Sequence, residues 1–304
     1  MFLALDGAAV NSSSKSGLIS LLKEDFHWVS FIWCFSHRLE LGLKDSLKDF
    51  IKPLEQSLIN LFQLYKRSSK KLRELKQLAS ILRNVYCFEN DSIRPEKATG
   101  TRWIDHKMRA MAKLNDKFGV YAAHLANVIA DTTKKCDRAT LQGKYDEFTE
   151  ANVLLRSAFL SDLLSPAKFL SLATQDGNID IITIVNLVRA THEKYTKLAK
   201  IYSSHPEKIF EQMPTLKEVL SKINDQNQYQ GTKLKYLQRE KDYLEGNVST
   251  VIQNIIDCFD QRYGVLIDEV DENTVKESVE GDKMLSDICK ILNTKVWPNE
   301  VDKQ

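Results

Sequence analysis

Helix-breaking residues are scarce in this chain, and their scarcity limits its fold more than any other feature. Only 11 glycines and 6 prolines occur among 304 residues. Leucine, lysine and glutamate, which favour helices, recur along the whole length. The sequence therefore predicts a mostly α-helical protein and argues against a fold built from strands and tight turns.

Apolar residues recur at the three- and four-residue spacing that marks one face of a helix. Pro53 is compatible with the first turn of a helix, where its missing N–H costs little. The polar stretch 89–101 and the acidic stretch 268–282 are predicted loops. The predicted helices cover 17–24, 36–50, 53–65, 72–82, 104–118, 120–131, 139–169 with a break near 165–166, 179–202, 216–222, 233–263 and 284–292.

Two short apolar segments give the only α/β signal in the sequence. The run at 28–35, WVSFIWCF, is interrupted only by Ser30, which is typical of a buried strand, and residues 2–5 form a second one. Buried strands need neighbours, so we expect the edge beside Phe2–Leu5 to recruit a protein partner or to self-associate. The expected organisation is a small α/β part at 1–50, a basic helical segment and loop at 51–100, and a helical region at 101–304.

The overall composition excludes several classes of protein. The formal net charge is only +2, so contact with nucleic acid has to come from a local cluster of cations. The five cysteines are widely spaced and odd in number, which favours a reducing compartment over a disulfide framework. No apolar run could span a bilayer, and no catalytic triad, GxGxxG or Walker motif is recognisable. We therefore expect no membrane span and no small-molecule substrate.

Asp6 is the first candidate for chemistry, because it follows an apolar strand and precedes a glycine. A carboxylate fixed at the end of a strand suits a divalent metal ion, which prefers oxygen ligands. Asp-Gly is also a common turn pair, and from spacing alone the turn is the better explanation of Asp6.

Cys34 and His37 form a C-x-x-H pattern where the second predicted strand gives way to a helix. A structural zinc ion needs four ligands, and no second pair of cysteines or histidines lies at ligand spacing. The simpler interpretation is that Cys34 is a small buried side chain and that His37 packs at the start of the helix.

Arg102 and Trp103 follow the predicted loop and open a helix. Arginine can bind phosphate and tryptophan can stack on a base, so contact with DNA is chemically reasonable. From these residues alone the better interpretation is that Trp103 anchors the core while Arg102 lies at its rim.

The densest cluster of cations lies at residues 66–76, where Glu74 is the only acid. Lys66, Lys70 and Arg73 recur at helical spacing, so much of one face is positive. Such a face fits phosphate groups, but a solvated helix surface would look nearly the same, and both interpretations stay open. The cations of the cluster are Lys66, Arg67, Lys70, Lys71, Arg73 and Lys76.

The order of these segments resembles the hAT transposase superfamily. Asp6-Gly7-Ala8-Ala9, the strand that ends at Cys34-x-x-His37, and Thr101-Arg102-Trp103 before a helical region follow one another as in that family. The stretches FIWCFSHRLELGLKDSLKD and GTRWIDHKMRAM are similar to its domesticated or degenerate branch, the zinc-finger-protein-like relatives. The resemblance covers most of the chain and is strongest at 4–50 and 95–130.

The resemblance implies an RNase H-like core interrupted by a long helical insertion, in a nuclear protein. In that family three acids hold two divalent metal ions, which activate water for phosphodiester cleavage. By resemblance Asp6 is the second acid, and Cys34 and His37 support the active site and DNA without binding zinc. Trp103 matches the tryptophan that stabilises a flipped base during hairpin formation.

The chain departs from this pattern at the other two acids. The resemblance implies a first acid on an upstream strand and a third after the insertion, beyond residue 304. Because Asp6 alone cannot hold two metal ions, we expect neither strand cleavage nor a bound cofactor unless partner acids are supplied. The expected function is that of an inactive transposase-derived fragment with weak DNA binding. The alternative is a helical scaffold for protein partners.

Overall fold

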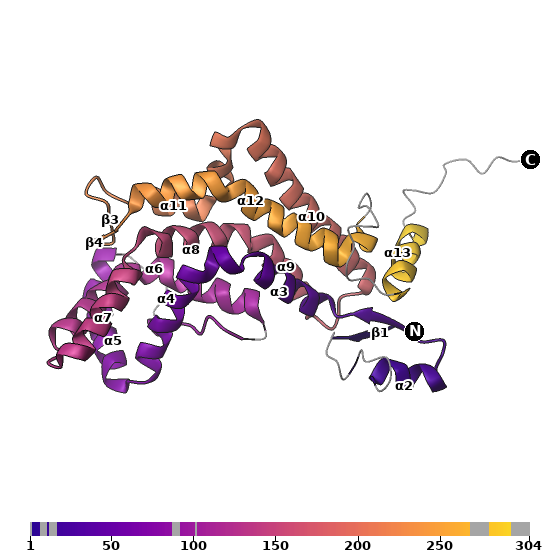
Figure 1. Ribbon diagram of the computed structural model, residues 1–304, viewed down its shortest axis with the longest axis horizontal. Coiled ribbons are helices and arrows are strands. Elements are labelled where there is room, and N and C mark those ends of the chain that lie inside the picture. Colours follow the sequence, from indigo (N-terminus) through magenta and orange to yellow (C-terminus); the bar gives the residue numbers. More distant parts are fainter. Residues whose placement is uncertain are drawn as a thin grey trace, which may run out of the picture. The chain divides into compact units, whose positions relative to one another are not determined.

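The computed structural model describes residues 2–6, 11, 17–86, 92–100, 102–267 and 280–292 (Figure 1). Within these residues the chain is mostly helical and has two small two-stranded sheets, which confirms the predicted mostly-α class with a small α/β part. Contacts divide the chain into two compact units that each combine distant segments. The first unit comprises Met1–Ser46, Phe169–Lys197 and Gln253–Gln304, and the second comprises Leu47–Lys168 and Leu198–Ile252.

The first unit contains a parallel pair of strands, β1 (Phe2–Leu5) and β2 (Ser30–Trp33). The strand predicted at 2–5 is confirmed. The strand predicted at 28–35 is shorter, because the Cys34 amide donates the last bond to the Leu5 carbonyl at 2.8 Å and a helix starts at the next residue. Among the described residues β1 pairs only with β2, so self-association through this edge stays a prediction.

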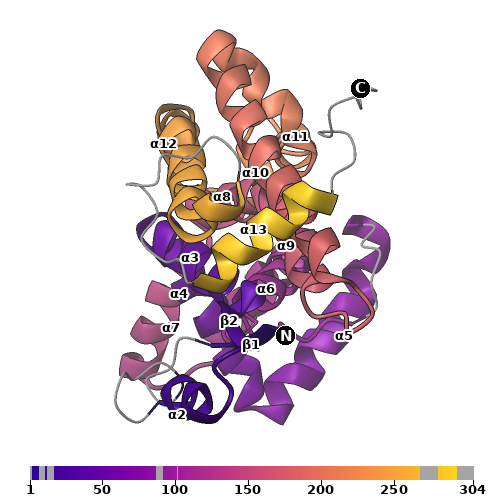
Figure 2. The same cartoon turned by 90° about the vertical axis from the view of Figure 1, so that its right-hand side faces the viewer.

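One helix of the first unit packs against this pair of strands. Helix α13 contacts both β2 and the short 3-10 helix η2, and it is the yellow helix of Figure 2. It begins at 280, so the last three residues of the acidic loop predicted at 268–282 are helical, and 268–279 lie outside the described residues. The helices assigned wholly to this unit are α2 (Leu18–Asp25), α3 (Phe35–Ser46), η2 (Gly264–Leu266) and α13 (Glu280–Leu292).

The second unit packs around α8 (Ala151–Leu163), which is apolar and buried on nearly all sides, as expected of a central helix. Figure 1 shows α8 beside α6, one of the helices that it contacts. Three helices carry residues of both units: α9 (Ser165–Ala173), α10 (Ile181–Ser204) and α12 (Leu237–Tyr263). The other helices of this unit are α4 (Lys48–Lys66), α5 (Ser69–Tyr86), α6 (Trp103–Ala130), α7 (Lys135–Phe148), η1 (Pro206–Gln212) and α11 (Pro214–Ser221).

Two breaks between helices fall at other positions than predicted. Helix α4 begins at Lys48, so Pro53 lies inside it and not in its first turn. The preceding break falls at Leu47, whose side chain is fully buried and whose φ and ψ are −104° and 1°. The helix predicted at 139–169 is also interrupted at 149–150, because Thr149 and Ala151 exchange backbone bonds of 2.9 Å with Lys235.

A β-hairpin that the sequence analysis missed completes the second unit. Its strands are β3 (Gln228–Tyr229) and β4 (Thr232–Lys233), so residue 233 is in a strand and helix α12 starts only at 237. The two central turn residues, Gln230 and Gly231, have φ values of 45° and 70°. Positive φ at both positions is typical of the type I′ turn, whose twist matches that of two paired strands.

None of the helices in the described part of the chain is both long enough and apolar enough to cross a bilayer.

Candidate functional site

The cations of the cluster at residues 66–76 lie on two helices of the second unit. Lys66 is in the last turn of α4, Arg67 is in the short connection, and the other four lie on α5. The chain leaves the helix at 67–68, so the helical spacing predicted from Lys66 to Arg73 is not continuous. All six except the half-buried Lys71 are exposed. We call these six residues, Lys66, Arg67, Lys70, Lys71, Arg73 and Lys76, the basic surface.

Few acids neutralise the basic surface. Within 66–76 six cations face one acid, Glu74. The Lys70 ammonium lies 3.7 Å from the Glu74 carboxylate, and the Lys70 side chain is 81% exposed, so this pair is weak. The excess of five positive charges in this segment exceeds the +2 of the whole chain. The basic surface therefore carries a strong local positive potential.

Two buried polar side chains, Tyr65 and His124, lie next to the basic surface. The Tyr65 hydroxyl is 2.9 Å from Nδ1 of His124, and Nε2 of His124 is 3.8 Å from Oε2 of Glu74. His124 is 2% exposed. Burial lowers the pKa of His124, the Lys71 charge lowers it further, and the Glu74 and Asp131 charges oppose the shift. The imidazole is therefore neutral near pH 7 and orders the first turns of α5 against α6.

Acid should destabilise the second unit through His124. The unfolded chain binds this proton at the ordinary histidine pKa of about 6.5, and the folded chain binds it only at lower pH. The contribution of His124 is thus fully present above that pH and is lost as the pH falls from there through the folded-state pKa. We expect His124→Gln to flatten the fall of the melting temperature below pH 6.5, as measured in a pH series. The same pH series on His37→Gln, a variant at an exposed histidine, is the control.

Asp6 lies at the end of β1 and is exposed. Its Oδ1 accepts a hydrogen bond of 2.5 Å from the side-chain amide of Asn11. Among the described residues there is no group of three or more histidine, cysteine, aspartate or glutamate side chains that could hold a metal ion.

Cys34 and His37 lie at the junction between β2 and α3, as expected, with Cys34 partly buried and His37 exposed. The sequence analysis missed Arg38, the residue that directly follows His37. Its guanidinium forms a double hydrogen bond with the Asp282 carboxylate of α13, at 3.0 and 3.1 Å, and both side chains are buried. It also donates to the Arg262 carbonyl at 2.8 Å. Arg38 therefore joins the two ends of the first unit.

Arg102 and Trp103 precede and open helix α6, and only Arg102 is exposed. The Trp103 ring is 5% exposed and lies 5.9 Å from the ammonium of the buried Lys107, which forms an ion pair with the half-buried Glu55. A base could stack on Trp103 only if these neighbours moved. The exposed Arg102 remains available to a phosphate group.

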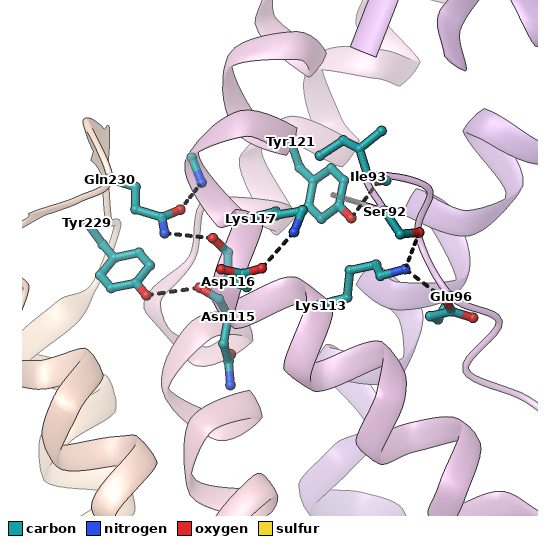
Figure 3. A network of polar contacts seen from close by, with 11 residues as sticks. Ser92, Ile93, Glu96, Lys113, Asn115, Asp116, Lys117, Tyr121, Tyr229 and Gln230 are labelled. Atoms are coloured by element: carbon teal, nitrogen blue, oxygen red, sulfur yellow. Dashed lines mark hydrogen bonds and ion pairs between the residues drawn. The ribbon is translucent and has the colours of Figure 1, made fainter. Parts of the chain in front are cut away.

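Helix α6 is kinked at Lys117, whose φ and ψ of −124° and 22° are not helical. The β3–β4 hairpin, which the sequence analysis missed, contacts α6 at this kink (Figure 3). The Tyr229 hydroxyl donates to the Asn115 carbonyl at 2.9 Å, and the Gln230 side chain donates to the Asp116 carbonyl at 2.9 Å. Insertion of side chains into the helical ladder is a common cause of a kink. A Q-G turn between short strands was the only sequence signal for this arrangement.

No model of a known protein family matches the chain, and no solved structure matches it significantly.

Proposed function

We propose that the second unit binds nucleic acid through the basic surface and that the chain derives from a hAT-superfamily transposase. The observation that carries the proposal of binding is the exposure of Lys66, Arg67, Lys70, Arg73 and Lys76 with a single acid among them. Derivation from a transposase is supported by the order of the motifs around Asp6, Cys34 and Trp103, and it implies that β1 and β2 belong to an RNase H-like core.

The expected recognition is electrostatic. Lysine and arginine side chains bind backbone phosphates and release counterions, so affinity falls steeply with salt and depends little on base sequence. Arg102 is a further phosphate ligand in this proposal. Strand cleavage is not part of it, because Asp6 is the one acid that the resemblance assigns to the active site. The proposed location is the nucleus, where DNA is available.

A charge-reversal variant tests the proposal. We expect Lys66→Glu, Lys70→Glu and Arg73→Glu together to weaken binding of a DNA duplex at least about 10-fold at 50 mM salt. We also expect the slope of log K against log salt to fall by about three, one for each lost phosphate contact. Fluorescence anisotropy with a labelled duplex, repeated at several salt concentrations, measures both quantities.

A matched control distinguishes the effect of the basic surface on DNA binding from the effect of the net charge. Lys200, Lys208 and Lys217 are exposed cations of the second unit outside α4 and α5, and their triple change to glutamate alters net charge equally. If the control variant binds DNA as weakly as the test variant does, DNA binding does not depend on the basic surface. If the unaltered chain binds no DNA at low salt, the proposal fails and the scaffold for protein partners is the better function. Manganese-dependent nicking that Asp6→Asn abolishes would instead indicate an active nuclease.

A further inference from the structure

The backbone of Tyr236 adopts a conformation that tyrosine rarely takes. Its φ is 58°, in the left-handed region that favours glycine and asparagine. Tyr236 directly precedes helix α12, and its carbonyl accepts a backbone bond of 3.0 Å from the Glu240 amide in the first turn. Serine, threonine, asparagine, aspartate and glycine are preferred at this capping position, and tyrosine is not among them. Asparagine or glycine would therefore make this junction more stable than tyrosine does.

The residues on either side of Tyr236 hold it in this conformation. The Lys235 amide donates to the Thr149 carbonyl, and the Lys235 carbonyl accepts from the Ala151 amide, both at 2.9 Å. On the other side Leu237 is 7% exposed and belongs to the core. The Tyr236 side chain between them is 62% exposed. Within the described part of the chain it makes neither a hydrogen bond nor an aromatic ring contact.

The ring of Tyr236 thus contributes little to the fold, although its backbone conformation costs free energy. Strained residues of this kind are concentrated at functional sites, where the position of the side chain matters more than stability. What Tyr236 offers to a ligand is a free aromatic face on a rigid backbone. Such a face suits a flat ring, because two stacked rings exclude water from both of their surfaces.

Two cations flank Tyr236 in the chain. Lys233 lies on β4 and Arg239 lies in the first turn of α12, and both are exposed. Neither has a carboxylate partner within the part of the chain that the structure describes. Each is three residues from Tyr236, so its Cα lies within about 11 Å of the Tyr236 Cα. The cation between them, Lys235, already pairs with Asp146 at 2.6 Å and is not counted.

The surrounding segment is positively charged. Residues 233–241 contain four cations and one acid, Glu240. That acid is buried and paired with Arg156, so it does not repel an anion at the surface. A ligand that fits this segment combines a flat ring with negative charges on both sides of it.

We propose that this segment binds a single-stranded nucleic acid, with one base stacked on Tyr236 and backbone phosphates bound by Lys233 and Arg239. Every base has an aromatic face, so this contact recognises a strand and not a particular sequence. The bases of a duplex are stacked on one another, so a free ring favours an unpaired strand. An acidic peptide would satisfy the cations and leave the ring unused. The three residues lie outside the basic surface, so this inference does not rest on the proposed function.

Fluorescence anisotropy of the full chain with a labelled thymidine strand of about 12 nucleotides, at about 50 mM salt, tests the proposal. We expect Tyr236→Asn to weaken binding of the strand about 5- to 150-fold, the usual effect of losing one stacked ring. The same change should raise the melting temperature, because asparagine adopts a positive φ more readily than tyrosine. Tyr236→Phe keeps the ring and should bind the strand within about 2-fold of the unaltered chain.

A second variant tests the phosphate contacts. Changing Lys233 and Arg239 together to alanine should lower the slope of log K against log salt for the thymidine strand by about 1.4, since each phosphate contact of a single strand contributes about 0.7. The matched control is the double change of Lys200 and Lys208 to alanine, two exposed cations elsewhere in the second unit. This control should leave the slope unchanged.

A duplex probe keeps this inference separate from the proposed function, because Tyr236→Asn should leave the affinity for a duplex unchanged. The proposal is overturned if the unaltered chain does not bind the strand, or if Tyr236→Asn binds it equally well. A lower melting temperature of Tyr236→Asn, or equal losses in Tyr236→Asn and Tyr236→Phe, would also overturn it. A uridine strand of the same length identifies the natural ligand. Tighter binding of uridine would support an RNA strand at this site, and tighter binding of thymidine a DNA strand.

Discussion

Replacing Arg156 by methionine is expected to lower the free energy of unfolding of the second unit by about 3–5 kcal/mol, the usual effect of breaking a buried ion pair from one side. The Arg156 guanidinium on α8 forms two hydrogen bonds with the Glu240 carboxylate on α12, at 2.7 and 3.2 Å. Both residues are 7% exposed. The methionine variant would leave the Glu240 carboxylate buried without its partner, and that desolvated charge causes most of the loss.

The surroundings of Arg156 add to this effect. Its Nη1 donates to the Phe50 carbonyl at 2.9 Å, and its guanidinium lies 5.1 Å from the Phe50 ring and 4.4 Å from the Tyr243 ring. Arg156 thereby joins α4, α8 and α12, which are far apart in the sequence. Urea unfolding monitored by circular dichroism measures the loss.

The double variant with Glu240→Leu is the control for Arg156→Met. Removing both charges leaves no unpaired ion in the core, so the double variant should recover at least about half of the lost stability. A loss below about 1 kcal/mol in the single variant would mean that Arg156 and Glu240 are solvated and do not form the buried pair described above.

Gly119→Ala should be the next most destabilising change, at about 2–4 kcal/mol. A Cβ atom at this position would lie 2.3 Å from the Gln230 carbonyl oxygen and 2.6 Å from the Gln230 Cβ. Because one of these neighbours is backbone, the hairpin has to move. The movement would break the bond of 2.8 Å that the Gly119 amide donates to the Gln230 side chain. The overpacking costs about 1–3 kcal/mol, and each lost hydrogen bond costs about 1 kcal/mol.

Gly143→Ala is the matched control, and it is expected to change the stability in the opposite direction. Gly143 lies on α7 of the same unit, and no atom lies within 4 Å of the position that its Cβ would take. Alanine there should raise stability by roughly 0.5–1 kcal/mol, because glycine loses more backbone freedom in a helix. Thermal unfolding of the two variants measures both changes in stability. Equal effects at Gly119 and Gly143 would contradict the close approach of the hairpin to α6.

The cation cluster could be predicted from the sequence, and a polar cleft beside the kink of α6 could not. Lys66 to Lys76 lie within eleven residues, so their proximity follows from chain connectivity whatever the fold. The cleft beside the kink of α6 is lined by residues of α5, α6, α8, α11, the β3–β4 hairpin and the segment 92–100. Two of these residues, Asn115 and Tyr229, are separated by more than a hundred positions. No local pattern marks Asn115 as a buried amide, since its neighbours along α6 include both exposed and buried residues.

The helices and their approximate ends follow from the sequence alone, because helical hydrogen bonds connect residues four apart and the apolar spacing records the buried face. The break at Thr149–Glu150, the kink at Lys117 and the β3–β4 hairpin were decided by the tertiary structure. Each depends on hydrogen bonds between residues about 85 to 115 positions apart. The same holds for Arg38 and Arg156, which the sequence presents as ordinary surface cations. Only the packing of distant helices removes their charges from water and gives each a buried carboxylate partner.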